Sequence, residues 1–217
     1  MRQARWKFNI TACILLTVSA LSGFAEEPVP IKLPAPRTDS GIPLMEALSK
    51  RKTTRSFSEK ELPPQVLSDL LWAAFGINRK DSGKRTAPSA VNWQEIDIYV
   101  AREDGLFLYD AVSHSLKPVL SEDIREITGL QDFTQQAPVN LIYVADFSRM
   151  MGADPEKKVF YSAADTGFIS QNVYLFCASG GLATVVLGMV DKPALEKKMG
   201  LRNDQKVILT QPVGYPE

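Results

Sequence analysis

The sequence of 217 residues has few of the residues that build metal centres or covalent crosslinks. It contains one histidine, His114, and beyond the first 25 residues a single cysteine, Cys177. One thiol cannot form an internal disulfide, and one histidine in a polar loop assembles neither a zinc site nor a serine triad. We therefore expect no metal site, a surface position for His114, and stability from an ordinary apolar core.

The sequence also lacks an excess of either charge, with 25 basic and 25 acidic residues. Three of the cations lie within the first seven residues, and the first 25 residues contain no acid, so the remainder has 22 basic and 25 acidic residues, a net charge of −3. A weakly acidic chain has no electrostatic reason to bind nucleic acid. We expect no nucleic-acid partner.

An apolar run of 12 residues from Ile10 to Leu21 is too short to span a bilayer comfortably. Cations precede it, and it is followed by Gly23-Phe24-Ala25, with small residues at 23 and 25. This arrangement is typical of a signal peptide, so residues 1–25 are predicted to be cleaved. The expected product is periplasmic or secreted, with no stable membrane insertion after cleavage.

Prolines are frequent between residues 26 and 43, where no periodicity is sustained. This composition predicts a Pro-rich linker at 26–41 and a folded domain at 42–217. About 190 residues suffice for one good core but not for two comfortable domains.

Apolar periodicity predicts alternating helices and strands after residue 42. One amphipathic helix precedes residue 51, and further helices are predicted at 64–75, 121–128, 156–179 and 193–199. Strands are predicted at 96–100, 106–109, 139–145 and 206–213, with a short strand or loop at 182–189. The run at 139–145 suits a central strand buried on both faces. The 156–179 helix is apolar over half its circumference, which indicates burial or contact with another subunit.

Residues 51–57, Arg-Lys-Thr-Thr-Arg-Ser-Phe, place three cations and three hydroxyls directly after the first helix. Guanidinium groups form charge-assisted hydrogen bonds to phosphate oxygens, and hydroxyls can supply more. The segment is therefore a candidate phosphate site. The alternative is a solvated basic helix end, since cations are favoured at helix C-termini.

Four stretches in order resemble the signatures of nitroreductase-family flavoproteins. They are residues 51–57; residues 88–94, Pro-Ser-Ala-Val-Asn-Trp-Gln; the turn at 180–182 with Leu-Gly-Met at 187–189; and Pro-Val-Gly-Tyr-Pro at 212–216. The resemblance covers about residues 42–217. The polar region 78–85 and the hairpin near Leu106 resemble the branch containing azoline-oxidising dehydrogenases, which mature thiazole- and oxazole-containing peptides.

The resemblance implies an α+β fold, a three-layer α-β-α sandwich with a mostly antiparallel sheet. It also implies an intertwined homodimer that holds two FMN molecules at the subunit interface. The half-apolar helix at 156–179 would then pack across the dimer axis.

The same resemblance implies the cofactor-binding residues. The FMN phosphate and ribityl chain would contact Arg51, Lys52, Thr53 and Arg55. The isoalloxazine ring would be lined, from the other subunit, by Pro88, Ser89, Ala90 and Asn92. Backbone contacts near N5 would come from Leu187, Gly188 and Met189. Many relatives continue to basic residues where this sequence ends at Glu217, so phosphate neutralisation is expected to rest on Arg51 and Arg55.

The implied function is an exported FMN-dependent oxidoreductase that transfers a hydride through flavin N5 between an unknown donor and a small organic acceptor such as a nitro compound or a quinone. The flavin does the chemistry, so no catalytic acid or base is named. NAD(P)H, the family's usual reductant, is cytosolic, and export would require another donor, such as a quinol or a partner protein. Two alternatives are an exported flavin-binding or scaffold protein with little turnover, and an FMN-free relative.

Overall fold

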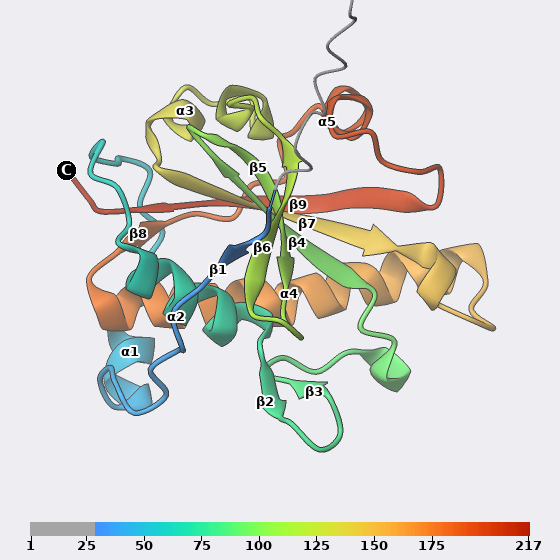
Figure 1. Cartoon of the computed structure of the whole chain (residues 1–217), viewed down its shortest axis with the longest axis horizontal. Coiled ribbons are helices and arrows are strands. Elements are labelled where there is room, and N and C mark those ends of the chain that lie inside the picture. The colour runs from blue at the N-terminus through green and yellow to red at the C-terminus, as the bar shows by residue number, and fades with distance from the viewer. Residues whose placement is uncertain (1–28) are drawn as a thin grey trace, which may run out of the picture.

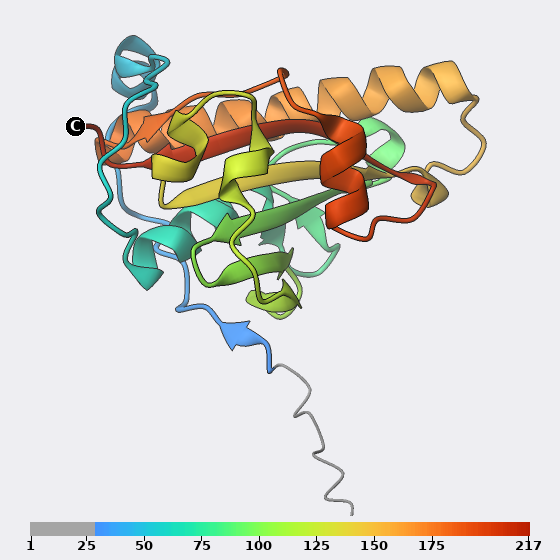
Figure 2. The same ribbon diagram turned by 90° about the horizontal axis from the view of Figure 1, so that it is seen from above.

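The computed structural model describes residues 29–217, so the expected signal peptide lies outside the described part. Its centre is a seven-stranded sheet in the order β1-β6-β5-β4-β7-β9-β8 (Figure 1). All neighbouring strands in this sheet are antiparallel. One apolar core joins the sheet to α2 and α4, and a second joins its other face to α5 (Figure 2). The predicted α+β, three-layer architecture is confirmed.

The strands of this sheet are β1 (Ile31–Lys32), β4 (Ile96–Arg102), β5 (Gly105–Asp110), β6 (Ser115–Leu120), β7 (Val139–Asp146), β8 (Ala183–Thr184) and β9 (Gln205–Gly214). A separate hairpin consists of β2 (Ile77–Arg79) and β3 (Lys84–Arg85). The α-helices are α1 (Leu44–Lys50), α2 (Pro64–Phe75), α3 (Phe133–Gln136), α4 (Pro155–Gly180) and α5 (Lys192–Lys198).

The central strand is β7, and all eight of its residues are buried between β4 and β9. Its continuous apolar sequence predicts this position. The β4–β5 hairpin also forms as expected, and Gly105 is required at its turn because a Cβ there would lie 2.3 Å from the Leu120 carbonyl oxygen. The helix predicted at 121–128 is instead a short 3-10 helix, η2 (Arg125–Thr128), and β6 was not predicted.

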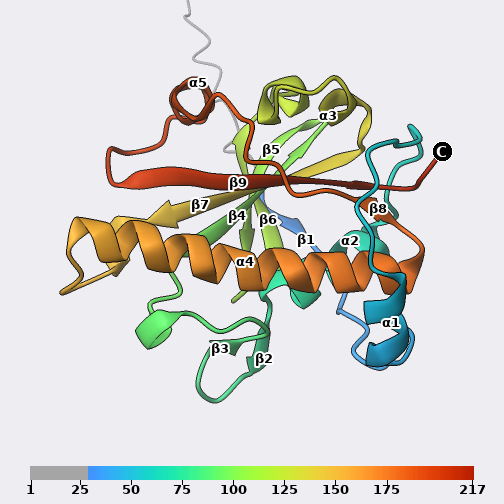
Figure 3. The ribbon, with the colours of Figure 1, turned by 180° about the vertical axis from the view of Figure 1, so that it is seen from behind.

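Helix α4 runs across the molecule along one face of the sheet and lies in front of the strands in the view of Figure 3. It begins with Pro155 after Asp154, whose carboxylate accepts a hydrogen bond from the Lys157 amide at 2.8 Å. It ends where Gly181 adopts the left-handed conformation, with φ of 67°. None of the helices formed by residues 29–217 combines the length and the hydrophobicity that a transmembrane span requires.

The N-terminal segment expected to act as a linker lies on the domain. Strand β1 pairs with β6, and Leu33 is buried in the main core. The Ser68 hydroxyl donates to the Pro34 carbonyl at 2.6 Å, and Arg37 forms a salt bridge with the buried carboxylate of Asp69. The predicted boundary between a linker and a folded domain at residue 42 is therefore wrong, because residues 31–33 contribute a core side chain and a sheet edge.

The expected surface position of His114 is also wrong, because its side chain is partly buried beneath this segment. One ring nitrogen lies 2.7 Å from the Ser68 hydroxyl and the other lies 3.0 Å from the Tyr109 hydroxyl. Its carbonyl accepts a hydrogen bond from the Leu33 amide. Burial lowers the pKa of His114. The imidazole therefore has a structural role in joining Ser68 to Tyr109, and the backbone carbonyl of the same residue holds the N-terminal segment.

Candidate functional site

The basic segment 51–57 leaves α1 in an extended conformation and is fixed at both ends. The Arg51 amide donates to the Ala47 carbonyl at 2.9 Å, which closes the helix. Phe57 is buried in a small apolar cluster, and between these ends the Thr54 amide donates to the Thr184 carbonyl of β8 at 3.0 Å. The segment is therefore tied to the end of the sheet.

Successive side chains of an extended segment point to opposite sides. The guanidinium carbon of Arg51 lies 5.3 Å from the Tyr174 ring centroid, and the Thr53 hydroxyl is 3.2 Å from the Tyr174 hydroxyl. By this alternation Arg55 is expected on the same side as Arg51 and Thr53. Lys52 instead lines a hollow of about 320 Å³ with Cys177 and Leu182, among other residues. The predicted cluster is thus split, with Lys52 on the side away from Tyr174.

The cations of this segment are not neutralised by carboxylates. Within residues 29–217, no salt bridge involves Arg51, Lys52 or Arg55. The exposed residues of the segment include Lys52, Thr53 and Arg55. Three cations held on a fixed backbone with an adjacent hydroxyl suit an anionic ligand such as a phosphate.

Tyr174, on α4, joins the basic segment to residues 185–189. Besides contacting Thr53, its hydroxyl accepts a hydrogen bond from the Val186 amide at 3.0 Å. The tyrosine side chain is buried, so the hydroxyl fixes both segments from inside the protein. Sequence analysis missed this residue, because its spacing on α4 indicates burial but not the partners of its hydroxyl.

Residues 187–189 run along β9. The amide and carbonyl of Leu187 form two hydrogen bonds with Thr210, at 2.8 and 3.1 Å, and the Leu187 side chain is buried. Gly188 and Met189 are exposed. A Cβ at Gly188 would meet only the Leu209 side chain, at an ordinary 3.7 Å, so the atoms of this protomer do not require the glycine. The backbone here is open to a ligand.

The loop 88–94 lies elsewhere on α4. Its Ala90 amide donates to the Asp165 carboxylate at 2.8 Å, and Asp165 precedes Tyr174 by nine residues. Nine residues of α-helix correspond to roughly 13 Å. The structure therefore brings Arg51 and Thr53 together with residues 187–189, but one protomer does not bring Pro88, Ser89, Ala90 and Asn92 to them.

The loop has an unusual backbone. Val91, Asn92 and Gln94 have φ of 52°, 58° and 48°, in the left-handed region that non-glycine residues seldom occupy. For a β-branched residue such as Val91 this is a strained conformation, and such strain clusters at functional sites. The side chain of Val91 is 82% exposed. A strained loop thus presents an apolar side chain to the outside.

Cys177 has no disulfide partner in the described part of the chain and is buried. Burial raises the pKa of its thiol. A buried, protonated thiol is not a nucleophile. Cys177 is therefore a packing residue behind the basic segment.

The fold and this arrangement define an oxidoreductase of a known class. Residues 48–215 match the model of the Nitroreductase family. A protein of Methanocaldococcus jannaschii named "Putative nitroreductase MJ1384" is 30% identical over 183 residues, which cover 80% of this chain and 91% of that protein. The chain belongs to the nitroreductase family.

Solved structures agree. A putative nitroreductase from Ralstonia eutropha superposes with a TM-score of 0.84 at 43% identity, over 88% of this chain and 91% of that one. Two structures share the fold at lower identity. A chain of the Escherichia coli microcin synthetase McbBCD complex has a TM-score of 0.67 at 20% identity, over 95% and 85% of the two chains. The NADPH:FMN oxidoreductase of Vibrio harveyi has a TM-score of 0.61 at 18% identity, over 80% and 68%.

Proposed function

We propose that this protein is an exported FMN-dependent oxidoreductase that passes a hydride between an electron donor and a small organic acceptor, such as a nitro compound or a quinone. The observation that carries the proposal is the side-by-side placement of unpaired cations and an open backbone. Arg51 and Thr53 lie on one side of Tyr174, and the same hydroxyl holds the segment that leads to Gly188.

The residues present fit FMN. Arg51 and Arg55 would neutralise the phosphate, and the Thr53 hydroxyl would hydrogen-bond the phosphate or the ribityl chain. The exposed backbone of Gly188 and Met189 would border the ring, where the missing Cβ leaves room for close approach. Lys52, on the other side of the segment, would contribute long-range charge. When bound, FMN supplies two-electron chemistry through hydride transfer at N5.

The site is proposed to be completed by a second protomer, because the loop 88–94 is too far away in its own. The exposed surface of α4 supports this: Val159, Phe160 and Phe168 are exposed, and Asp165, which is buried, is the sole charged residue in the sequence 159–180. Within residues 29–217, and apart from the backbone of α4 itself, no atom lies within 4 Å of where a Cβ on Gly167 would be, so a second helix could approach closely.

A twofold axis near residues 169–170, midway between Asp165 and Tyr174, would make two α4 helices cross antiparallel. That crossing sets Asp165 of the partner subunit opposite Tyr174. The partner's loop 88–94 would then face Arg51 and the 187–189 backbone. In this arrangement, Pro88, Ser89, Ala90 and Asn92 line the ring as the family resemblance implies.

The donor depends on the compartment. If the leader at 1–25 directs export, NAD(P)H is absent at the site of action, and a quinol or a partner protein replaces it. The small acceptor then enters the open side of the site near Met189, which is 64% exposed.

The test begins with absorption spectroscopy of the purified full-length protein. A flavin spectrum, FMN released on denaturation, and flavin in the periplasmic or secreted fraction are expected. Reduction is then measured anaerobically with NADH, NADPH and a soluble quinol, followed by reoxidation with nitro and quinone acceptors. A colourless protein that cannot be reconstituted with FMN contradicts the proposal. Bound FMN that no donor reduces favours the flavin-binding alternative.

A further inference from the structure

Glu95 carries a carboxyl group that is buried in the protein interior. It precedes β4 and follows the strained loop 88–94. Its side chain is 0% exposed, and within residues 29–217 neither oxygen accepts a hydrogen bond from a donor group. Its backbone carbonyl accepts from the Asp146 amide at 2.8 Å, so the residue is fixed in place. An ionised carboxylate in this position would be desolvated without compensation.

The neighbour of this carboxyl group is a second one. Asp165, on α4, is 2% exposed and raises the pKa of Glu95 both through its charge and as a hydrogen-bond partner. The Asp165 carboxylate also accepts the hydrogen bond from the Ala90 amide. Two adjacent buried carboxyl groups cannot both ionise without strong repulsion, whereas with one proton between them they form a hydrogen bond. The pair explains how Glu95 is tolerated in the interior.

We propose that Glu95 and Asp165 share one proton, and that this shared proton positions the loop 88–94. Glu95 donates the proton to Asp165, and Asp165 holds the Ala90 amide. Glu95 is thus a positioning residue that acts on the loop through Asp165. The consequence for flavin rests on the proposed function above, whereas the hold on the loop does not.

The loop needs such an anchor because its backbone is strained. Three of its residues, Val91, Asn92 and Gln94, are in the left-handed region and relax if they are released. Other hydrogen bonds hold its end at Gln94: the Gln94 amide donates to the Ser89 hydroxyl at 3.0 Å, the Gln94 side chain accepts from Arg85 at 2.8 Å, and the Gln94 carbonyl accepts from Arg149 at 3.0 Å. Within residues 29–217, two contacts tie the loop to α4: Trp93 packs edge-to-face on Tyr161 with ring centroids 5.9 Å apart, and the Ala90 amide donates to Asp165. The second is the one that depends on the charge of a carboxylate.

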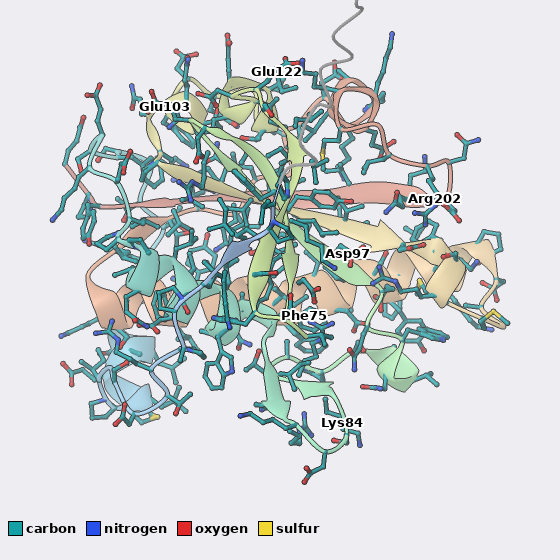
Figure 4. All side chains as sticks on the ribbon, in the orientation of Figure 1. Phe75, Lys84, Asp97, Glu103, Glu122 and Arg202 are labelled. Atoms are coloured by element: carbon teal, nitrogen blue, oxygen red, sulfur yellow. The ribbon has the colours of Figure 1, made fainter. Side chains whose placement is uncertain are left out.

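The hold depends on pH. Burial, followed by the adjacent Asp165, raises the pKa of Glu95 to about 7. Arg149 opposes the shift, but its guanidinium is already engaged by Asp97, labelled in Figure 4, and by Asp146 at the end of β7. A raised pKa means that the proton is present below about pH 7 and is lost as the pH rises through that value. Two buried negative charges then repel each other, and the hydrogen bond that holds the Ala90 amide to α4 is weakened.

The first experiment reads the loop without flavin. Hydrogen exchange of the peptide spanning residues 86–95 is measured in the purified protein at about pH 6 and about pH 9 and corrected for intrinsic exchange. We expect protection to fall by about tenfold or more in the wild type, the factor for one pKa unit. Infrared spectroscopy should show a protonated carboxylic acid band at the lower pH that is missing from Glu95→Gln.

The Glu95→Gln variant is close in shape, and its amide donates to Asp165 at every pH, so protection should be the same at both pH values. Glu156→Gln, at the exposed start of α4, should behave as the wild type. Equal wild-type protection at both pH values overturns the proposal, as does a pH-dependent loss that persists in Glu95→Gln. Asp165→Leu should lose protection at both pH values, and if it does not fold, the Glu95→Gln comparison still decides.

The second experiment measures FMN dissociation by fluorescence across the same range. We expect the affinity of the wild type to fall above pH 7 and that of Glu95→Gln to stay constant. Absence of FMN binding at any pH contradicts the proposed function but leaves the exchange result standing. FMN binding with a loop whose protection does not change contradicts the shared proton alone.

Discussion

The hydroxyl oxygen of Tyr174 lies 3.2 Å from the hydroxyl oxygen of Thr53, a residue 121 positions earlier in the chain. The same oxygen accepts a hydrogen bond from the Val186 amide. One atom of α4 therefore fixes the spacing between the segment that carries the cations and the segment that leads to Gly188. Any ligand that spans the two segments depends on this spacing.

Tyr174→Phe should weaken both stability and flavin binding. It leaves the Val186 amide without its acceptor, and an unmade hydrogen bond of a buried group costs about 1 to 2 kcal/mol. We expect the free energy of unfolding to fall by that amount in urea titrations, and FMN to bind less tightly in fluorescence titrations. Tyr161→Phe is the matched control, because within residues 29–217 the Tyr161 hydroxyl forms no hydrogen bond to a side chain or the backbone. An unaltered FMN affinity in Tyr174→Phe would mean that the spacing is not set by this hydroxyl.

Arg55→Ala should lower FMN affinity without lowering stability. The side chain is exposed and forms no salt bridge in the described part of the chain, so its removal costs the fold little. Loss of a charged hydrogen bond to phosphate corresponds to about 1.5 to 3 kcal/mol, or roughly 10- to 100-fold in affinity. Fluorescence titration measures the affinity, and thermal unfolding of the ligand-free protein measures stability.

The alternation of side chains in the basic segment gives this test an internal comparison. Lys52→Ala should weaken FMN binding less than Arg55→Ala, because Lys52 points to the opposite side. Lys197→Ala, an exposed lysine on α5, should change nothing. Equal losses in the Lys52 and Arg55 variants would show that the two sides contribute alike and that the phosphate does not lie on the Tyr174 side.

The architecture could be predicted because its main elements have clear periodicity. The continuous apolar run of β7 and the three- and four-residue spacing in α2 both match the structure. The N-terminal segment could not be predicted in this way. Its prolines interrupt any apolar periodicity that would indicate a strand. The burial of Leu33 also depends on pairing with a sheet edge and on a hydrogen bond to His114, about 80 residues away in sequence.

The candidate site was predictable only in part. The cations of residues 51–55 and the glycine at 188 are visible as residue types, and the family resemblance relates them to one cofactor. The roles of the Tyr174 hydroxyl and the Glu95 carboxyl cannot be predicted from the sequence, because their hydrogen-bond partners depend on where two distant segments meet. The sequence likewise could not predict that Lys52 and Arg51 point to opposite sides, since α1 and an extended segment meet at Arg51.

His114→Asn should change how stability depends on pH. Burial holds the pKa of His114 below its ordinary 6.5, so the unfolded chain binds the proton first as the pH falls. The contribution of the native imidazole is therefore present above about pH 6.5 and is lost on acidification. Asparagine tolerates the left-handed backbone found here, with φ of 49°.

The measurement is the free energy of unfolding between about pH 7.5 and about pH 5, compared between the wild type and His114→Asn. Carboxylates common to both proteins cancel in the difference. We expect the wild type to be more stable near neutrality, and the difference in the free energy of unfolding between the two proteins to become smaller as the pH falls. A difference in the free energy of unfolding that stays constant, or that grows on acidification, would show that the imidazole does not titrate in contact with Ser68 and Tyr109.

Phe168→Glu should separate the proposed dimer and remove flavin with it. Phe168 is 49% exposed on the face of α4 near the proposed twofold axis, so in a dimer each glutamate would lie close to its symmetry mate in an apolar interface. A buried, unpaired charge is strongly destabilising. Sedimentation equilibrium should show a dimer for the wild type and a folded monomer for the variant, with FMN affinity lost because loop 88–94 of the partner is absent. Val112→Glu, 82% exposed between β5 and β6, is the control and should remain dimeric. A Phe168→Glu monomer that binds FMN as tightly as the wild type would place the whole site within one protomer.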